Sequence, residues 1–193
     1  MQRVFVHASI ARDVAERLAH SVKCLRVGDP LFETTEVGPL IRHREVNRVH
    51  GWVLEARSAG AEVLSGGNTL TESCYAPTVL FDPPDKSRVS QQEIFGPVVC
   101  VYPFTGLDAA IARANALPFA FQAAVFTRDL DRALYASTRL DASAVMVNDH
   151  TAFRVDWMPF AGLRQSGLGT GGVPWTFHEM QTAKMTVLRS PVL

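Results

Sequence analysis

The feature that most constrains the fold is a regular alternation of strand-sized apolar runs with helix-sized segments in the second half of the chain. After Pro97 this alternation predicts, in order, a strand at 98–102, a helix near 108–116, a strand at 123–126, a helix at 129–138 and a strand at 144–147. Strands that alternate with helices pair side by side through helical crossovers. The pattern therefore predicts an α/β fold with a largely parallel sheet and helices on both faces.

The first half continues the same pattern. Residues 3–7 combine an apolar run with β-branched side chains, which predicts a short strand, and Ser9 is the expected N-cap of the helix that follows. Its apolar side chains recur every four positions, at Ile10, Val14, Leu18 and Val22. Further elements are expected as a helix at 42–58, a strand at 62–64 and an extended segment at 77–81.

The composition fits a globular protein that forms one domain over residues 1–193. Of the 193 residues, 47% are apolar and 20% are charged, and 19 basic residues balance 19 acidic ones. With no net charge, no nucleic acid partner is expected, and no apolar run is long enough for a membrane span. The first residues lack the apolar core of a signal peptide, so a cytoplasmic location is expected.

Cysteine and histidine spacings do not favour a metal centre. The three cysteines, Cys24, Cys74 and Cys100, form no CxxC pair and are expected to be free thiols. His43 and His50 share a predicted helix but lie seven residues apart, whereas a zinc pair on a helix uses a spacing of four. No metal site is predicted.

A glycine-rich segment at 162–172 contains the spacing G-x-G-x-x-G from Gly167 to Gly172. A dinucleotide loop with this spacing needs a strand directly before it and a helix that opens on it. The segment instead follows a loop and runs into Pro174, so a flexible surface or active-site loop is the preferred interpretation. A short helix near 175–180 and a final strand at 184–188 are expected after it.

The segment from Gln91 to Pro97 places a carboxylate, an aromatic ring and a glycine turn before a buried strand. An ionised Glu93 can accept two hydrogen bonds from a vicinal diol such as a ribose, and the ring of Phe95 can cover a planar heterocycle. On chemistry alone the alternative is a turn with a solvated Glu93 and a core Phe95.

The segment Glu93–Val98 resembles the E-I-F-G-P motif of the NAD(P)-dependent aldehyde dehydrogenase superfamily, and the resemblance extends over essentially the whole chain. The segment 147–160 and the tail 166–174 are similar to the branch of the family that handles phosphonoacetaldehyde, lactaldehyde or glyceraldehyde 3-phosphate. The other segments that match in the family's order are 3–7, 27–30, 38–41, 60–61 with 66–67, 75–80, 114–115, 124–129, 147–148, and 158–162 with 166–167.

The resemblance implies roles for particular residues and an NAD or NADP cofactor. Glu93 corresponds to the carboxylate that holds the nicotinamide ribose, and Phe95 would lie beside the nicotinamide. Phe160 resembles a residue near the substrate tunnel, although this chain has Ala161 where the family usually has glycine. Arg154, in the loop resembling the substrate-proximal one, is a candidate for binding an anionic group on a small aldehyde. A local salt bridge from Arg154 to Asp149 or Asp156 is the alternative.

The family's catalytic groups are expected upstream of Met1. They are the nucleophilic cysteine, the general-base glutamate and the cofactor domain, so no residue of this chain is assigned a catalytic role. Cys24 in a helix, Cys74 in a loop and Cys100 in a strand are interpreted as incidental thiols. His150 is interpreted as a solvated loop residue. The isolated chain is expected neither to oxidise aldehydes nor to bind the cofactor tightly.

Two functions follow from the resemblance. In the first, the chain is the C-terminal catalytic-domain portion of an oxidoreductase, with an upstream cofactor-domain half as its partner. It would then be a truncated reading frame, an engineered piece or half of a split enzyme. In the second, it is a non-enzymatic oligomerisation or binding module. Either way the resemblance implies a homo-oligomer, a dimer or tetramer, that uses the strand at 184–188.

Overall fold

The computed structural model describes residues 1–192, which form two compact units divided between Ala110 and Ile111. Each unit is described by itself. The elements of the first unit, up to the helix that reaches the border, are β1 (Arg3–His7), α1 (Ala8–Lys23), α2 (His43–Ser58), β2 (Glu62–Ser65), β3 (Thr78–Phe81), α3 (Arg88–Gln91), β4 (Val98–Phe104) and α4 (Leu107–Asn115).

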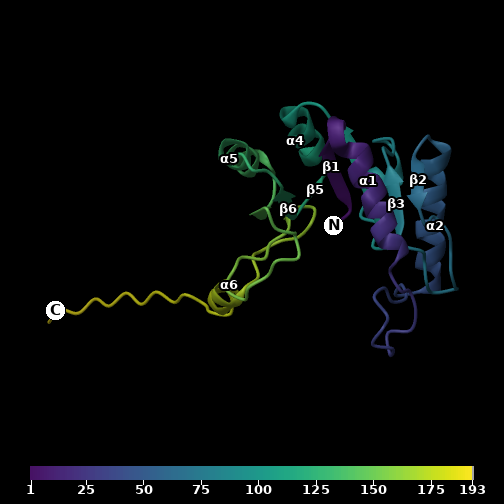
Figure 1. Cartoon of the computed structure of the whole chain (residues 1–193). Coiled ribbons are helices and arrows are strands. Elements are labelled where there is room, and N and C mark those ends of the chain that lie inside the picture. The colour runs from purple at the N-terminus through teal and green to yellow at the C-terminus, as the bar shows by residue number, and fades with distance from the viewer. Residues whose placement is uncertain (193) are drawn as a thin grey trace. The chain divides into compact units, whose positions relative to one another are not determined.

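The first unit contains a four-stranded sheet in the order β1-β4-β3-β2 (Figure 1). Strands β1, β4 and β3 are parallel, as predicted, whereas β2 pairs antiparallel with β3 at the edge. The sheet is therefore mixed. The chain between β2 and β3 contains no helix that would carry it across the sheet, and strands joined without a crossover run antiparallel.

Helices cover both faces of this sheet, as predicted. Val79 of β3 and Val101 of β4 pack with α1, whereas Leu80 and Cys100 point to the opposite face and pack with α2. This division follows from the alternation of side chains along a strand.

Helix α1 differs from the prediction in its buried face and its N-cap. Its fully buried residues are Ala11, Ala15 and Ala19, one position after the apolar series that the periodicity selected, and Ile10 is exposed. Alanine methyl groups allow the helix to lie close to the sheet. The N-cap is His7 rather than Ser9, because the His7 ring accepts a hydrogen bond from the Ser9 backbone N–H.

The second unit contains two short strand pairs. Strands β6 (Gln122–Val125) and β7 (Ala144–Val147) are parallel and are joined through α5 (Leu130–Arg139). Strands β5 (Phe119–Ala120) and β8 (Leu163–Arg164) are antiparallel. Helix α5 begins one residue after the predicted start, because Asp129 is its N-cap and its side chain accepts a hydrogen bond from the Arg132 N–H.

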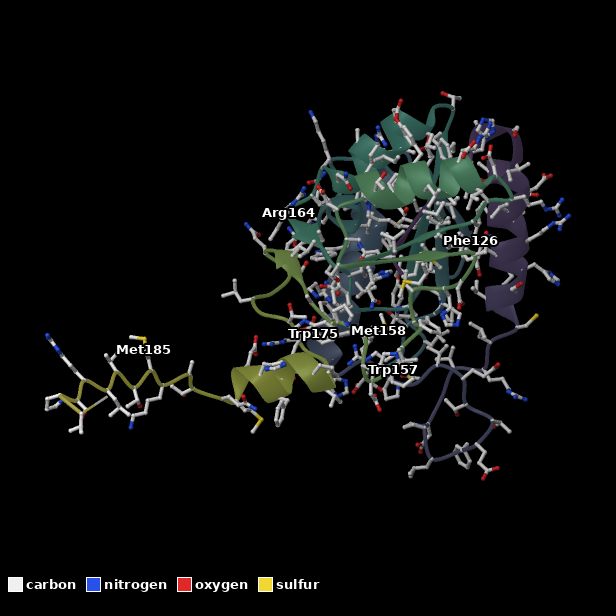
Figure 2. All side chains as sticks on the ribbon, turned by 90° about the vertical axis from the view of Figure 1, so that its left-hand side faces the viewer. Phe126, Trp157, Met158, Arg164, Trp175 and Met185 are labelled. Atoms are coloured by element: carbon white, nitrogen blue, oxygen red, sulfur yellow. The ribbon has the colours of Figure 1, made fainter. Side chains whose placement is uncertain are left out.

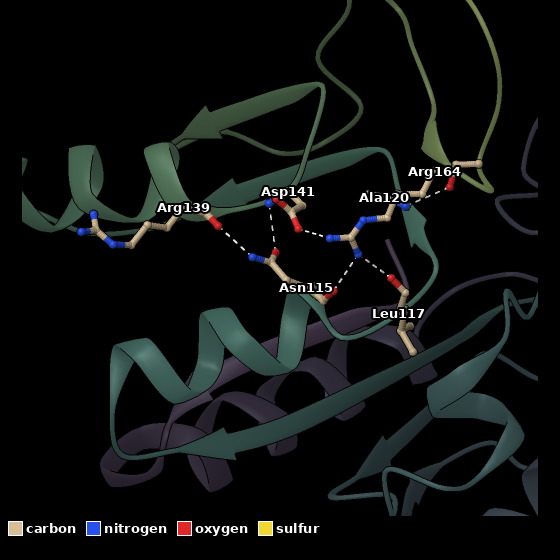
Figure 3. A network of polar contacts seen from close by, with 7 residues as sticks. Asn115, Leu117, Ala120, Arg139, Asp141 and Arg164 are labelled. Carbon is tan, nitrogen blue, oxygen red and sulfur yellow. Dashed lines mark hydrogen bonds and ion pairs between the residues drawn. The ribbon is translucent and has the colours of Figure 1, made fainter.

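A polar network around Arg164 joins several segments of the second unit (Figure 3). The Arg164 Nη1 donates to the carbonyls of Asn115 and Leu117, both at 2.7 Å, and its Nη2 pairs with Asp141. The Asn115 side chain donates to the Arg139 carbonyl at 2.7 Å and accepts from the Asp141 N–H at 2.9 Å. The network fixes the ends of α4 and α5 against β8.

The C-terminal part of the chain corrects two expectations. Helix α6 (Val173–Glu179) begins two residues before the predicted start at 175 and ends one residue before the predicted end at 180. The predicted strand at 184–188 has no ladder partner within the described residues. Its segment is extended and exposed, with Met185 on it (Figure 2), because a strand requires a neighbour to hydrogen-bond and one chain supplies none here.

Among residues 1–192 no helix combines the length and the apolar character that crossing a membrane requires.

Candidate functional site

The predicted cofactor-binding turn lies between α3 and β4 in the first unit. Ile94 at its centre is 1% exposed, whereas Glu93 before it and Phe95 after it are exposed. Phe95 adopts a left-handed backbone with φ +47° and is 74% exposed. The alternative of a core Phe95 is therefore wrong. Burial of the middle residue presents the two flanking side chains to solvent.

Gly96 brings this turn close to α2. A Cβ atom on Gly96 would lie 2.9 Å from a methyl carbon of Val49, which is fully buried. The Pro97 carbonyl then accepts a hydrogen bond from the Thr78 N–H at 2.8 Å and begins the pairing of β4 with β3. The turn is thus packed on a helix on one side and anchored to the sheet on the other.

Glu93 has an unengaged carboxylate. Among the described residues it forms no hydrogen bond and no ion pair, so both of its oxygens are available as acceptors. A carboxylate with two free oxygens fits the two hydroxyls of a ribose, and an exposed ring two residues away fits the flat face of a heterocycle. The residues present therefore fit a nicotinamide nucleoside.

The two predicted substrate residues are in contact with each other in the second unit. The Arg154 guanidinium carbon lies 4.5 Å from the centroid of the Phe160 ring, in a cation–π arrangement. The Phe160 ring also meets Phe121 edge-on, with centroids 4.8 Å apart. Within residues 1–192 Arg154 forms no ion pair, which contradicts the alternative of a salt bridge to Asp149 or Asp156.

The loop after Phe160 tolerates its departure from the family pattern. Ala161 is 9% exposed and lies outside the left-handed region, so its methyl group adds no backbone strain. At Gly162, in contrast, a Cβ atom would lie 2.4 Å from the Ser166 carbonyl oxygen. The Phe160 backbone is tied to Gly171 by two hydrogen bonds of 3.0 and 2.8 Å, which close this loop.

The three thiols are not arranged as nucleophiles. Cys100 is fully buried in β4, and burial raises its thiol pKa to about 12. Cys74 is buried, and Cys24 is exposed. Cys24 lies at the C-cap of α1 rather than in mid-helix, and its Sγ is 3.6 Å from the His20 carbonyl oxygen. All three are free, as predicted.

A feature that the sequence did not reveal is an open hollow of about 680 Å³ at the carboxyl ends of β6 and β7. Asn148 at its edge has φ +57°, and its side chain accepts a hydrogen bond from the Thr127 N–H at 2.9 Å. The residues that line it are Phe126, Thr127, Arg128, Asp129, Leu130, Ala133, Val147 and Asn148. In the sequence, the only indication of this hollow is the pair Val147 and Asn148 at the end of the predicted strand 144–147.

No group of three or more metal-ligating side chains occurs in the part of the chain that the structure describes. His43 and His50 are each engaged elsewhere, His43 with Glu72 and His50 with Tyr75. The two predicted pairs, Glu93 with Phe95 and Arg154 with Phe160, remain the candidate site residues.

Comparisons with known proteins extend over nearly the whole chain. The 3-sulfolactaldehyde dehydrogenase of Priestia aryabhattai is 36% identical over 188 residues, which are 97% of this chain and 39% of that protein. The crystal structure of aldehyde dehydrogenase 21 from Physcomitrella patens, in complex with the reaction product succinate, superposes with a TM-score of 0.89 at 36% identity. The superposed part covers 93% of this chain and 37% of the Physcomitrella patens chain.

A third match is the glyceraldehyde-3-phosphate dehydrogenase GapN from Methanocaldococcus jannaschii, complexed with NADP. Its TM-score is 0.87 at 34% identity, over 92% of this chain and 38% of that one. The chain therefore spans about two fifths of the length of these proteins. The model of the family described as "Aldehyde dehydrogenase family" matches residues 1–186. The chain belongs to the aldehyde dehydrogenase family, as its motifs predicted.

Proposed function

We propose that this polypeptide supplies the nicotinamide-ribose and substrate contacts of an NAD(P)-dependent aldehyde dehydrogenase that converts a small anionic aldehyde to a carboxylate. One observation carries the proposal: the turn that buries Ile94 presents the free carboxylate of Glu93 and the exposed ring of Phe95 together. Membership of the family supports the reaction class.

The cofactor, NAD or NADP, supplies the acceptor for the hydride that leaves the oxidised carbon. Glu93 holds the ribose hydroxyls with its two carboxylate oxygens, and Phe95 packs against the adjoining heterocycle. Both act by orientation, which places the reacting carbon of the cofactor in a fixed position. Neither residue transfers a proton or forms a covalent bond.

Arg154 binds the anionic group of the aldehyde. Its guanidinium rests on Phe160 and has no carboxylate partner among the described residues, so its donors are available to a phosphate, sulfonate or carboxylate. The names of the similar proteins support this choice, since 3-sulfolactaldehyde, succinate and glyceraldehyde 3-phosphate all carry an anionic group.

The 193-residue polypeptide by itself does not oxidise aldehydes and binds the cofactor weakly. Two of its thiols are buried, and Cys24 lies at the carbonyl end of a helix, where an anion is not stabilised. The nucleophile and general base come from an upstream half, and residues 1–193 are the C-terminal portion of the catalytic domain.

Self-association through the C-terminal segment is the second part of the proposal, and it is also the basis of the alternative non-enzymatic function. Met185, Val187 and Leu188 are 85%, 77% and 82% exposed on an extended segment. An unpaired extended segment with apolar side chains is a template for pairing with another chain. The free thiols fit a cytoplasmic location for such an assembly.

The decisive experiment measures NAD(P)-dependent aldehyde oxidation by the 193-residue polypeptide and by the same polypeptide joined to the upstream portion of the Priestia aryabhattai relative. We expect activity only in the joined protein. Activity of the 193 residues alone would contradict the assignment of the nucleophile. Inactivity of a folded joined protein would favour the binding module.

The substrate class is tested by Arg154→Ala in the joined protein, with aldehydes of matched size that carry an anionic, a neutral or a cationic group. We expect a loss of roughly tenfold or more in kcat/KM for the anionic aldehyde alone. Arg128→Ala is the matched control, because Arg128 is also exposed and has no ion-pair partner among the described residues. An equal loss for all three aldehydes would refute anion binding by Arg154.

A further inference from the structure

We propose that Gln2 and Arg48 are positioning residues that clamp the backbone N–H and carbonyl of Ile94 and thereby set the orientation of Glu93 and Phe95 toward the cofactor. The proposal rests on the proposed function of that turn. Gln2 comes from the segment before β1 and Arg48 from α2, so two elements far from the turn in sequence hold the two polar backbone groups of one residue.

The Gln2 side chain uses its whole amide on this turn. Its Oε1 accepts the Ile94 N–H at 2.8 Å, and its Nε2 donates to the Val89 carbonyl at 3.0 Å and the Gln92 carbonyl at 2.7 Å. Both N–H groups and the carbonyl oxygen are therefore satisfied in a single orientation. The Gln2 backbone carbonyl accepts the Cys100 N–H at 2.8 Å, so the same residue is also joined to β4.

Arg48 holds the other polar group of the same residue. Its Nη2 donates to the Ile94 carbonyl at 2.6 Å, while its Nε donates to Glu45 at 2.6 Å. The guanidinium carbon also lies 4.5 Å from the centroid of the Trp52 ring, which is nearly buried. An arginine fixed by an ion pair and by an aromatic face presents its remaining donor in one direction.

The clamp acts where the backbone needs support. Phe95 has a left-handed conformation, which a side chain other than glycine adopts at an energetic cost, and such a conformation persists only where its surroundings enforce it. The N–H and the carbonyl of Ile94, the preceding residue, are both bound to side chains, and the Ile94 side chain is buried. The two side chains thus hold the peptide units on either side of Ile94, the one that joins it to Glu93 and the one that joins it to Phe95.

The first test measures hydrogen exchange of the Ile94 amide by NMR in the 193-residue polypeptide. We expect Gln2→Met and Arg48→Met to raise its exchange rate by roughly fivefold or more relative to amides of β3. Arg12→Met is the control, because Arg12 pairs with Glu16 and Glu62 on α1 and β2 and makes no contact with the turn. Unchanged exchange in both turn variants would overturn the proposal.

A milder pair of variants keeps the test available if a methionine variant does not fold. Gln2→Glu retains the acceptor for Ile94 but places a carboxylate against the carbonyls of Val89 and Gln92, so we expect faster exchange than in the unmodified chain. Arg48→Lys retains a cation that can donate to the Ile94 carbonyl, and we expect it to restore most of the protection lost in Arg48→Met. Equal exchange in Arg48→Lys and Arg48→Met would contradict a directed hydrogen bond.

The second test measures whether the fixed orientation of the turn contributes to cofactor binding. In the joined protein we expect Gln2→Met and Arg48→Met to raise the KM for the nicotinamide cofactor by roughly fivefold, with the KM for the aldehyde unchanged. Glu93→Gln separates the positioning role of Gln2 and Arg48 from the proposed function of the turn itself. If Glu93→Gln raises the cofactor KM and the clamp variants do not, the positioning role is wrong. If Glu93→Gln has no effect, the proposed function of the turn is wrong.

Discussion

Arg3 and Cys100 are direct partners in the parallel ladder between β1 and β4. The Cys100 side chain is fully buried on the face that packs with α2. Burial disfavours the thiolate and raises its pKa to about 12, so this thiol stays neutral at any physiological pH. The centre of the sheet thus carries a cysteine that is protected by its position.

Alkylation will separate the three cysteines by their exposure. With iodoacetamide at about pH 8, near the ordinary thiol pKa, we expect rapid labelling of Cys24 and slow labelling of Cys74 and Cys100, because only Cys24 is exposed in the folded chain. Peptide mass spectrometry over a time course checks this. Labelling of all three in urea is the control. Labelling of Cys100 as fast as that of Cys24 in the native protein would contradict the buried strand.

Stability will fall on the alkaline side. The pKa of Cys100 rises from 9.0 to about 12 and that of Tyr75 from 10.0 to about 12, both through burial. Each group is neutral in the folded state, so its contribution is complete below its unfolded pKa and is lost as the pH rises from that value toward 12.

The measurement is urea unfolding from about pH 7 to about pH 11, a range that spans the ionisation of unfolded cysteine and tyrosine. We expect a flat free energy of unfolding up to about pH 9 and then a decline, since the pKa of the unfolded cysteine is 9.0. In Cys100→Val the decline will begin later, near the ionisation of tyrosine. The same onset in Cys100→Val and the unmodified chain would argue against a contribution from this thiol.

Two glycine substitutions will have opposite effects on stability. Gly51 lies inside α2, and nothing lies within 4 Å of the position that a Cβ atom would take there, so Gly51→Ala will stabilise the protein by about 0.5–1 kcal/mol. Gly66 has φ +68°, and a Cβ atom there would lie 2.4 Å from the Pro77 carbonyl oxygen. Gly66→Ala will destabilise by at least about 2 kcal/mol. Chemical denaturation of both variants tests the pair, and a shift of the same sign in both would be inconsistent with this backbone.

Removal of the Arg164 side chain will loosen the second unit. Arg164→Ala deletes the hydrogen bonds to Asn115 and Leu117 and the ion pair to Asp141, and its partial exposure limits the loss to about 1–2 kcal/mol. Hydrogen exchange at the C-terminal end of α5 should accelerate. Arg132→Ala, which removes an exposed ion pair to Asp129 on the same helix, should change stability by less than about 0.5 kcal/mol. Equal effects of the two variants would refute the structural role of the network.

The sequence predicted elements with strong periodicity and missed those that depend on partners. The elements β4, α4, β6, α5 and β7 follow from hydrophobic pattern and turn residues, and they occur close to their predicted bounds. Strand β2 was expected, but its antiparallel direction depends on a connection without a helix. The two-residue strands β5 and β8 and the four-residue α3 are too short to leave a periodic signal.

The candidate site divides in the same way. Glu93 and Phe95 were selected from a contiguous motif, and the structure adds that both are exposed around a buried Ile94. The side chain of Gln2 reaches Ile94 across 92 positions of sequence, and no local pattern encodes that contact. The contact of Arg154 with Phe160 likewise depends on how the loop folds back on itself, whereas the sequence left a salt bridge as an open alternative.

The alanines of α1 have one more consequence. Where Ala11, Ala15 and Ala19 face the sheet, the helix contributes methyl groups that have no rotamers, and the partly buried Leu18 and Val22 pack on the same side. A larger side chain at the fully buried Ala15 would find no free volume between the helix and the strands, so the helix would have to shift away from the sheet. The small alanine side chains therefore set the distance between α1 and the sheet. This interface will tolerate fewer substitutions than the opposite face of the sheet, where large side chains pack together.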